Sequence, residues 1–277
     1  MRISLIKTLL FSLLVWSTQL QAQMFGYGCG TQSLMDPNPI GPIRPCHWGV
    51  QAKAGLVPTY YAKPQENELF AVLPPPPGIL DFNTKHQFSD YFHLPWTAAL
   101  EGSYNLDNHW QIFLEGMWKQ ARGKTATDLS PGFNLKYEVG DYRAWGVYFG
   151  GRYYFDRFIA FCSGISPFIG AKVGFMRRET VTTSVYGSLI GTIFPFGLGR
   201  HTLYREVNSA SGGIQAGIDF ACTDWFSVVL TAEALVARAI KPNSNVLLPF
   251  PGINVLSFGK TGLEISVPVT LGLRLTF

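Results

Sequence analysis

Charged residues are scarce in this chain of 277 residues, where they make up 14% of the total against about 25% in an ordinary soluble domain. Hydrophobic residues make up 47%, so the chain is also too apolar to be disordered. The shortage of charge weighs against a water-soluble enzyme. Lys and Arg exceed Asp and Glu only by 22 to 18 and form no basic run, so we expect no nucleic-acid partner.

Long apolar runs are missing after the first 22 residues. The one long uncharged window, 180–199, contains four glycines, a proline and a start rich in Thr and Val. That composition suits strands and loops rather than a helix. Because a helical membrane protein of this length would show several apolar stretches of about 18 residues or more, we do not expect helical spans.

Cysteine is limited to four residues, and no two of them have the close spacing of a zinc site. We therefore expect no metal and no other cofactor. In an exported protein an even number of cysteines favours disulfides. We favour a pairing of Cys29 with Cys46, and the connections that carry Cys162 and Cys222 leave a second pairing open.

The N-terminus has the pattern of a secretory signal peptide. Arg2 and Lys7 precede the apolar run 8–16, and Ala22 offers a small residue at the cleavage site. A retained anchor helix is the alternative, but a bilayer takes about 20 apolar residues. We expect a signal peptide over 1–22 and a periplasmic segment over 23–46.

The C-terminal segment 262–277 alternates without interruption, and in a strand successive side chains point to opposite faces. A strand in a soluble sheet usually has about 5 to 6 residues, whereas about 9 to 11 tilted residues cross a bilayer. The segment is therefore typical of a membrane-spanning strand. One face is apolar: Leu263, Ile265, Val267, Val269, Leu271, Leu273, Leu275 and Phe277. The other face is polar or small: Gly262, Glu264, Ser266, Pro268, Thr270, Gly272, Arg274 and Thr276.

The same alternation recurs upstream and predicts eight strands in all. The segment 226–240 also fits a helix, and Arg238 falls on its apolar face unless a bulge intervenes. The seven upstream segments are 48–56, 96–104, 110–118, 145–153, 169–175, 214–220 and 226–240.

Connections between these strands alternate in length. Residues 105–109 and 222–225 form short turns, whereas the other side carries the long loops 58–94, 122–140, 181–203 and 241–260. Short periplasmic turns and long extracellular loops are typical of outer-membrane barrels, as are aromatic residues at the strand ends. The sequence therefore predicts an all-β fold, an antiparallel eight-stranded transmembrane β-barrel over 47–277, in the outer membrane of a Gram-negative bacterium.

The export signal, the eight strands and the terminal Phe277 together resemble the small outer-membrane barrels of the OmpA, OmpX and OmpW type. That resemblance implies that Phe277 is an assembly signal for the barrel-assembly machinery. The segment Cys46-His-Trp-Gly49 gives a weaker resemblance to the major outer membrane porins of intracellular bacteria, which have more strands. Outer-membrane lipid and lipopolysaccharide are the expected surroundings, and four basic residues at the loop bases could meet lipopolysaccharide phosphates: Arg200, Arg205, Lys241 and Lys260.

The predicted inner face carries five acids and five bases, which suggests mutually paired charges. A barrel of eight strands has room inside for side chains but not for a wide channel. We interpret these charges as a salt-bridged plug. The alternative is a narrow porin-like channel for small or apolar solutes, with water in the gaps beside the inner glycines. The ten residues are Lys53, Glu101, Glu115, Lys119, Arg152, Lys172, Asp219, Glu233, Glu264 and Arg274.

No catalytic site is expected. His86, Asp90 and His93 resemble a water-activating group, but we interpret them as a polar loop, and we expect Glu101 and Glu115 to pair structurally with the nearby Lys119. The apolar loop segments 189–196 and 246–251 either bind a host or envelope surface ligand or pair as extended hairpins over the barrel mouth. The sequence thus favours a structural or surface-interaction role.

Overall fold

The computed structural model describes residues 43–73, 78–130, 133–156, 158–160, 163–189, 196–238, 253–258 and 262–277, all within the unit Gly41–Phe277. The predicted signal peptide over 1–22 and nearly all of the segment 23–46 lie outside these residues, so both stay predictions. In the described part of the chain, no helix has the length and apolar character needed to span a membrane.

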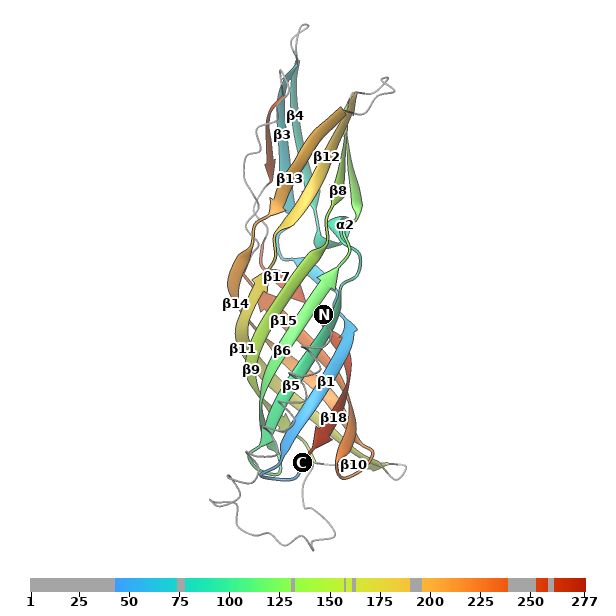
Figure 1. Ribbon diagram of the computed structural model, residues 1–277, viewed down its shortest axis with the longest axis vertical. Helices are drawn as coiled ribbons and strands as arrows, with labels where there is room; N and C mark the ends of the chain where they lie inside the picture. The colour runs from blue at the N-terminus through green and yellow to red at the C-terminus, as the bar shows by residue number, and fades with distance from the viewer. Residues whose placement is uncertain are drawn as a thin grey trace, which may run out of the picture. The chain divides into compact units, whose positions relative to one another are not determined.

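Eight antiparallel strands form a closed barrel, as the sequence predicts (Figure 1). Each of the eight barrel strands pairs with the next barrel strand along the chain. The last pairs with the first, from Gly49 opposite Thr276 to Leu56 opposite Val269. Closure leaves the barrel without a free edge. The strands are β1 (Trp48–Leu56), β5 (Trp96–Asn105), β6 (Trp110–Ala121), β9 (Tyr142–Tyr154), β11 (Ser163–Arg178), β14 (Val207–Ala221), β15 (Phe226–Ala237) and β18 (Val269–Thr276).

The segment that also fitted a helix is strand β15, which pairs with β14 and β18. It ends at Ala237, so Arg238 lies beyond the strand and no bulge is needed to explain its position. Tertiary pairing on both sides overrides the helical preference of its alanines and leucine.

The last predicted strand is divided into β17 (Glu264–Ser266) and β18 by Val267 and Pro268. Proline has no N–H to donate, yet the Pro268 carbonyl still accepts the Glu233 N–H at 2.9 Å. β17 pairs with β15 and with β2 (Thr59–Tyr61), which continues the line of β1. The alternation over 262–277 therefore holds through the interruption.

The long connections contain further strands. The sheet β13-β12-β8-β7 repeats the order of β14, β11, β9 and β6 because each of its strands adjoins one of these in the chain. A second sheet has the order β16-β3-β4. The remaining elements are β3 (Gln65–Leu73), β4 (Gly78–His86), α2 (Phe88–Tyr91), β7 (Thr125–Ser130), β8 (Phe133–Val139), β10 (Phe158–Ala160), β12 (Val181–Leu189), β13 (Phe196–Tyr204) and β16 (Ile253–Phe258).

The extended hairpin β12–β13 carries the first of the two apolar loop segments. Residues 190–195 and 239–252, which contain most of the two apolar loop segments, lie outside the described residues.

Outward side chains of the barrel are apolar and exposed, as for Val173 at 68% and Ile214 at 67%. Aromatic residues bound this surface at both ends. Trp110 and Trp118 lie eight residues apart on β6, which is about 20 Å along the axis of a barrel with tilted strands. The turn end carries Trp48, Tyr104, Trp110, Tyr153 and Trp225, and the loop end carries Trp96, Trp118 and Trp145.

We predict that Leu114→Arg strongly destabilises the folded protein in lipid bilayers. Leu114 is 57% exposed and lies midway between Trp110 and Trp118, where an arginine facing lipid costs about 2–4 kcal/mol. Urea unfolding in bilayers measures the effect. The control is Leu106→Arg, in a turn and 50% exposed, which we expect to be nearly neutral. Equal tolerance of both variants would mean that the outward face meets water.

Candidate functional site

The inside of the barrel is filled by charged side chains that alternate with the outward apolar ones. All ten inner residues that the sequence singles out are buried, from 0% exposed for Lys119 and Arg152 to 7% for Arg274. They lie in three groups, which we call the lower, middle and upper layers, ordered from the turn end to the loop end of the barrel.

The middle layer joins two lysines to three glutamates. Lys53 Nζ lies 2.9 Å from Glu101 Oε2, also pairs with Glu115 and lies 3.8 Å from Glu233 Oε1. Lys172 Nζ lies 2.6 Å from both Glu115 Oε1 and Glu233 Oε2. Five strands contribute these residues, so the layer links much of the barrel wall through charge-assisted hydrogen bonds.

The lower layer is built on two arginines. Arg152 makes a bidentate contact with Glu101, with both N···O distances at 2.5 Å, and its guanidinium carbon lies 4.3 Å from the centre of the Phe113 ring. Arg274 pairs with Asp219 and donates to the Tyr154 hydroxyl at 2.6 Å. The planar fork of arginine suits both kinds of contact.

The upper layer centres on Glu264. Its Oε1 lies 2.8 Å from Lys119 Nζ, its Oε2 lies 2.9 Å from Arg178 Nε, and the Tyr142 hydroxyl donates to both oxygens at 3.2 Å. Arg178 is not among the predicted inner residues, because the predicted strand stopped at 175. The signal was present: Lys172, Met176 and Arg178 share one parity, and continuing the alternation would have placed Arg178 inside.

One predicted pairing is wrong. The sequence placed Lys119 beside Glu101 and Glu115, whereas the structure gives both carboxylates to Lys53 and gives Lys119 to Glu264. The physical reason is distance. Lys119 lies four residues beyond Glu115 on the same strand, or about 13 Å away. Lys53 projects inward from β1, beside the strand of Glu101, at the same level along the barrel axis as the two carboxylates.

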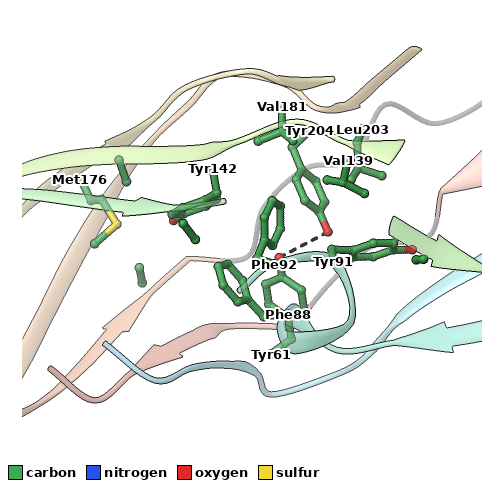
Figure 2. Close-up of a cluster of buried hydrophobic side chains, with 14 of the residues drawn as sticks. Tyr61, Phe88, Tyr91, Phe92, Val139, Tyr142, Met176, Val181, Leu203 and Tyr204 are labelled. Carbon is green, nitrogen blue, oxygen red and sulfur yellow. Dashed lines mark hydrogen bonds between the residues drawn. The ribbon is translucent and has the colours of Figure 1, made fainter. Parts of the chain in front are cut away.

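An aromatic cluster, which we call the roof, consists of Tyr61, Phe88, Tyr91, Phe92, Tyr142 and Tyr204 (Figure 2). It adjoins the upper layer at the loop end, where Tyr142 contacts Glu264 and Lys119 lies 5.5 Å from the centre of the Phe88 ring. Phe88 on α2 and the following Phe92 pack on Tyr142, with ring centres 5.2 and 5.6 Å apart. The Tyr61 and Tyr204 hydroxyls are 3.3 Å apart. Burial raises the pKa of Tyr204, so its phenol stays neutral at physiological pH.

A small apolar cluster, the floor, closes the turn end. It consists of Ile43, Tyr154, Phe168 and Val229, and Ile43 is 5% exposed. The next residue, Arg44, holds the segment in place: its carbonyl accepts from Asn105 Nδ2 at 2.8 Å, and its guanidinium lies 3.1 Å from Asp224. The sequence does not predict that this segment closes the barrel, because packing across the barrel leaves no local pattern.

The short turn 105–109 at this end is held by Asp107. Its carboxylate accepts the backbone N–H groups of His109 and Trp110 at 2.7 Å each, which holds the pKa of Asp107 below its usual range. These bonds satisfy donors at the start of β6 that the barrel ladder leaves free.

The histidine and aspartate group of the first loop lies in and around α2. Asp90 accepts the backbone N–H of Gln87 at 2.7 Å at the start of α2. The His86 ring lies 4.9 Å from the Tyr91 ring, and His93 is exposed. Among the described residues, no group of three or more metal-ligating side chains occurs.

The cysteine prediction needs a correction at Cys222, which is a free and exposed thiol. Its Sγ lies 3.6 Å from the carbonyl oxygen of Phe220 at the end of β14, and the pairing with Cys162 that the sequence left open does not form. Cys29 and Cys162 lie outside the described residues, and the pairing of Cys29 with Cys46 stays a prediction.

Other predicted site residues lie at the two ends of the barrel. Phe277 is 56% exposed at the turn end, and its N–H donates to the Trp48 carbonyl at 2.8 Å. Arg200 donates to the Thr182 hydroxyl at 3.0 Å, and Arg205 directly follows β13. Lys241 and Lys260 lie outside the described residues.

We predict that Glu264→Gln destabilises the barrel by about 3–5 kcal/mol, as expected when one partner of a buried ion pair is removed. The variant leaves Lys119 and Arg178 as uncompensated buried cations. Glu138→Gln is the matched control, because the Glu138 side chain is 47% exposed against Lys136, and exposed pairs contribute at most about 1 kcal/mol. Equal unfolding free energies for the two variants would contradict a stabilising upper layer.

Comparisons with known proteins give structural likeness only. No family model matches the chain, and no curated protein matches it. Among solved structures it is similar to Neisserial surface protein A, with 12% identity, a TM-score of 0.40 and coverage of 83% of this chain and 97% of that one. For the outer membrane protein OprG from Pseudomonas aeruginosa these values are 11%, 0.40, 86% and 99%.

A third solved structure, the outer membrane protein AlkL in lipid bilayers, has 9% identity and a TM-score of 0.36, and the match covers 89% of this chain and 97% of that one. Likeness at this level carries no argument about function, and the architecture rests on the strand pairing of this chain. The predicted resemblance to small outer-membrane barrels is confirmed as architecture, by closed pairing of eight antiparallel strands.

Proposed function

We propose that this chain is an integral protein of a Gram-negative outer membrane whose barrel is a closed anchor rather than a channel. The observation that carries the proposal is the filling of the barrel from end to end. The floor, three ion-paired layers and the roof follow one another along the axis. Each layer joins strands on different sides of the wall, so opening a path means breaking buried ion pairs.

The role that fits a closed anchor is presentation of the strands beyond the barrel. The sheet β13-β12-β8-β7 buries Val139, Val181 and Val185 on one face and leaves Lys136, Glu138 and Arg200 on the surface. A rigid paired scaffold of this kind suits contact with a surface ligand of the envelope or host. Arg200 and Arg205 also suit contact with lipopolysaccharide phosphates at the loop end.

A narrow channel is the second candidate, and one observation favours it. Four uncharged inner side chains on the neighbouring strands β1, β18 and β15 have buried polar atoms without a hydrogen-bond partner: Gln51, Ser227, Thr231 and Thr270. Buried polar groups are normally satisfied by protein or by water. Water along this side of the lumen would give a thin polar path past the charged layers.

Planar-bilayer recording of the refolded protein separates the two candidates. For a closed anchor we expect no reproducible unitary conductance, because the charged layers and both end clusters obstruct the lumen. Unitary steps that Glu264→Gln or Arg274→Gln alters would instead establish the channel. Leu106→Arg, which changes only a turn, serves as the control for leakage caused by the preparation itself.

We further propose that residues 1–22 direct export and that Phe277 acts as an assembly signal. Phe277 contributes little packing because more than half of its surface is exposed. We therefore predict that Phe277→Ala refolds in detergent like the parent protein but accumulates in the outer membrane several-fold less in cells. Leu263→Ala, exposed at the other end of the same strand region, is the control. Equal cellular levels of the two variants would contradict this role.

A further inference from the structure

The upper layer contains one more positive than negative charge. Lys119 and Arg178 both pair with a single carboxylate, that of Glu264. The remaining acids of the lumen are committed to other bases in the middle and lower layers. In total the described buried residues include the five predicted acids against six bases, because Arg178 joins the five predicted ones.

Contacts around Lys119 are those of a charged ammonium group. Its Nζ donates to Glu264 and to the Ser266 hydroxyl, each at 2.8 Å. It also lies 5.5 Å from the centre of the Phe88 ring and 5.3 Å from that of Tyr142, the arrangement of a cation–π contact.

Arg178 has a buried donor without an acceptor in the upper layer. Its Nε donates to Glu264 at 2.9 Å and its Nη1 to the Ser209 hydroxyl at 3.2 Å. Its Nη2 has no hydrogen-bond partner. Water does not replace that partner at the surface, because the whole residue is only 1% exposed. A buried guanidinium nitrogen without an acceptor is costly, more so where the local charge is uncompensated.

Charged groups on the neighbouring strands do not supply the missing anion. Arg177 and Glu206 pair with each other at 2.6 Å with both side chains more than 40% exposed. Arg143 is also half exposed and lies 4.0 Å from Asp141. These groups face the outside of the wall, whereas Arg178 points inward.

We propose that the upper layer binds one small monovalent anion, such as chloride, at Arg178 Nη2. The anion supplies the missing acceptor and brings the charge of the layer to zero. A single atomic anion suits the position because Glu264 and Ser209 already accept from the other two nitrogens of the guanidinium, at 2.9 and 3.2 Å. The site depends on the packing inside the barrel and not on the role proposed for the whole protein.

Two measurements on the full refolded protein test the proposal. In crystals grown in bromide, we expect an anomalous peak within hydrogen-bond distance of Arg178 Nη2. In solution, replacing gluconate by chloride at constant ionic strength should raise the unfolding midpoint. Above the dissociation constant the unfolding free energy should rise with the logarithm of the chloride concentration, as for binding of one ligand to the native state. A water molecule at Nη2 in bromide crystals, or a midpoint that does not respond to chloride, would overturn the proposal.

Variants locate the effect. Arg178→Gln removes the excess charge together with the free donor and should abolish the chloride response. The control Arg177→Gln, on the outer face of the same strand, should retain it in full. If Arg178→Gln does not fold, Lys119→Met is the alternative variant, because it also brings the layer to neutrality. It should reduce the chloride-induced rise of the unfolding midpoint at least ten-fold. Loss of the response in Arg177→Gln, or its persistence in either inner variant, would show that chloride acts elsewhere.

Discussion

Satisfaction of backbone hydrogen bonds without water is the constraint on which the rest of this structure depends. In the hydrocarbon region an unpaired N–H or C=O costs several kcal/mol, so a sheet that crosses it has to close. Closure is achieved here by the pairing of β18 with β1 over the length of β1. Even Pro268, which has no N–H, sits where the bonds around it remain satisfied by Pro58 and Glu233. Every strand is then fixed in register by two neighbours.

Closure also removes the polar side chains of the inner face from water. A charge moved from water into a protein interior is strongly unfavourable unless it is paired and hydrogen-bonded. The barrel solves this with carboxylates, four of which contact two cations each, such as Glu115 between Lys53 and Lys172. Apolar clusters at both ends keep these ion pairs out of bulk solvent. The ion pairs therefore hold opposite walls together while they fill the space.

The end clusters show how sequence-distant parts complete the barrel. The roof takes Phe88 and Phe92 from the first long connection, Tyr142 from β9 and Tyr204 from β13 (Figure 2). The floor takes Ile43 from the segment before β1 and Tyr154, Phe168 and Val229 from three strands. Strand continuity explains the sheets beyond the barrel in the same way: β13, β12, β8 and β7 keep the order of the barrel strands to which they connect.

By itself the sequence determined the eight barrel strands, the ten inner charges that it singled out and the closed class of fold, because period-two alternation is a local property that each strand carries alone. Even the ambiguous segment 226–240 followed it up to Ala237. Only the tertiary structure decided which charges meet: strand tilt and register set the height of each side chain, so Lys53 rather than Lys119 reaches Glu101 and Glu115. It also paired Arg178 with Glu264, 86 positions away, and built the roof and the floor, since contacts across a closed barrel join residues far apart in the chain and leave no spacing to read.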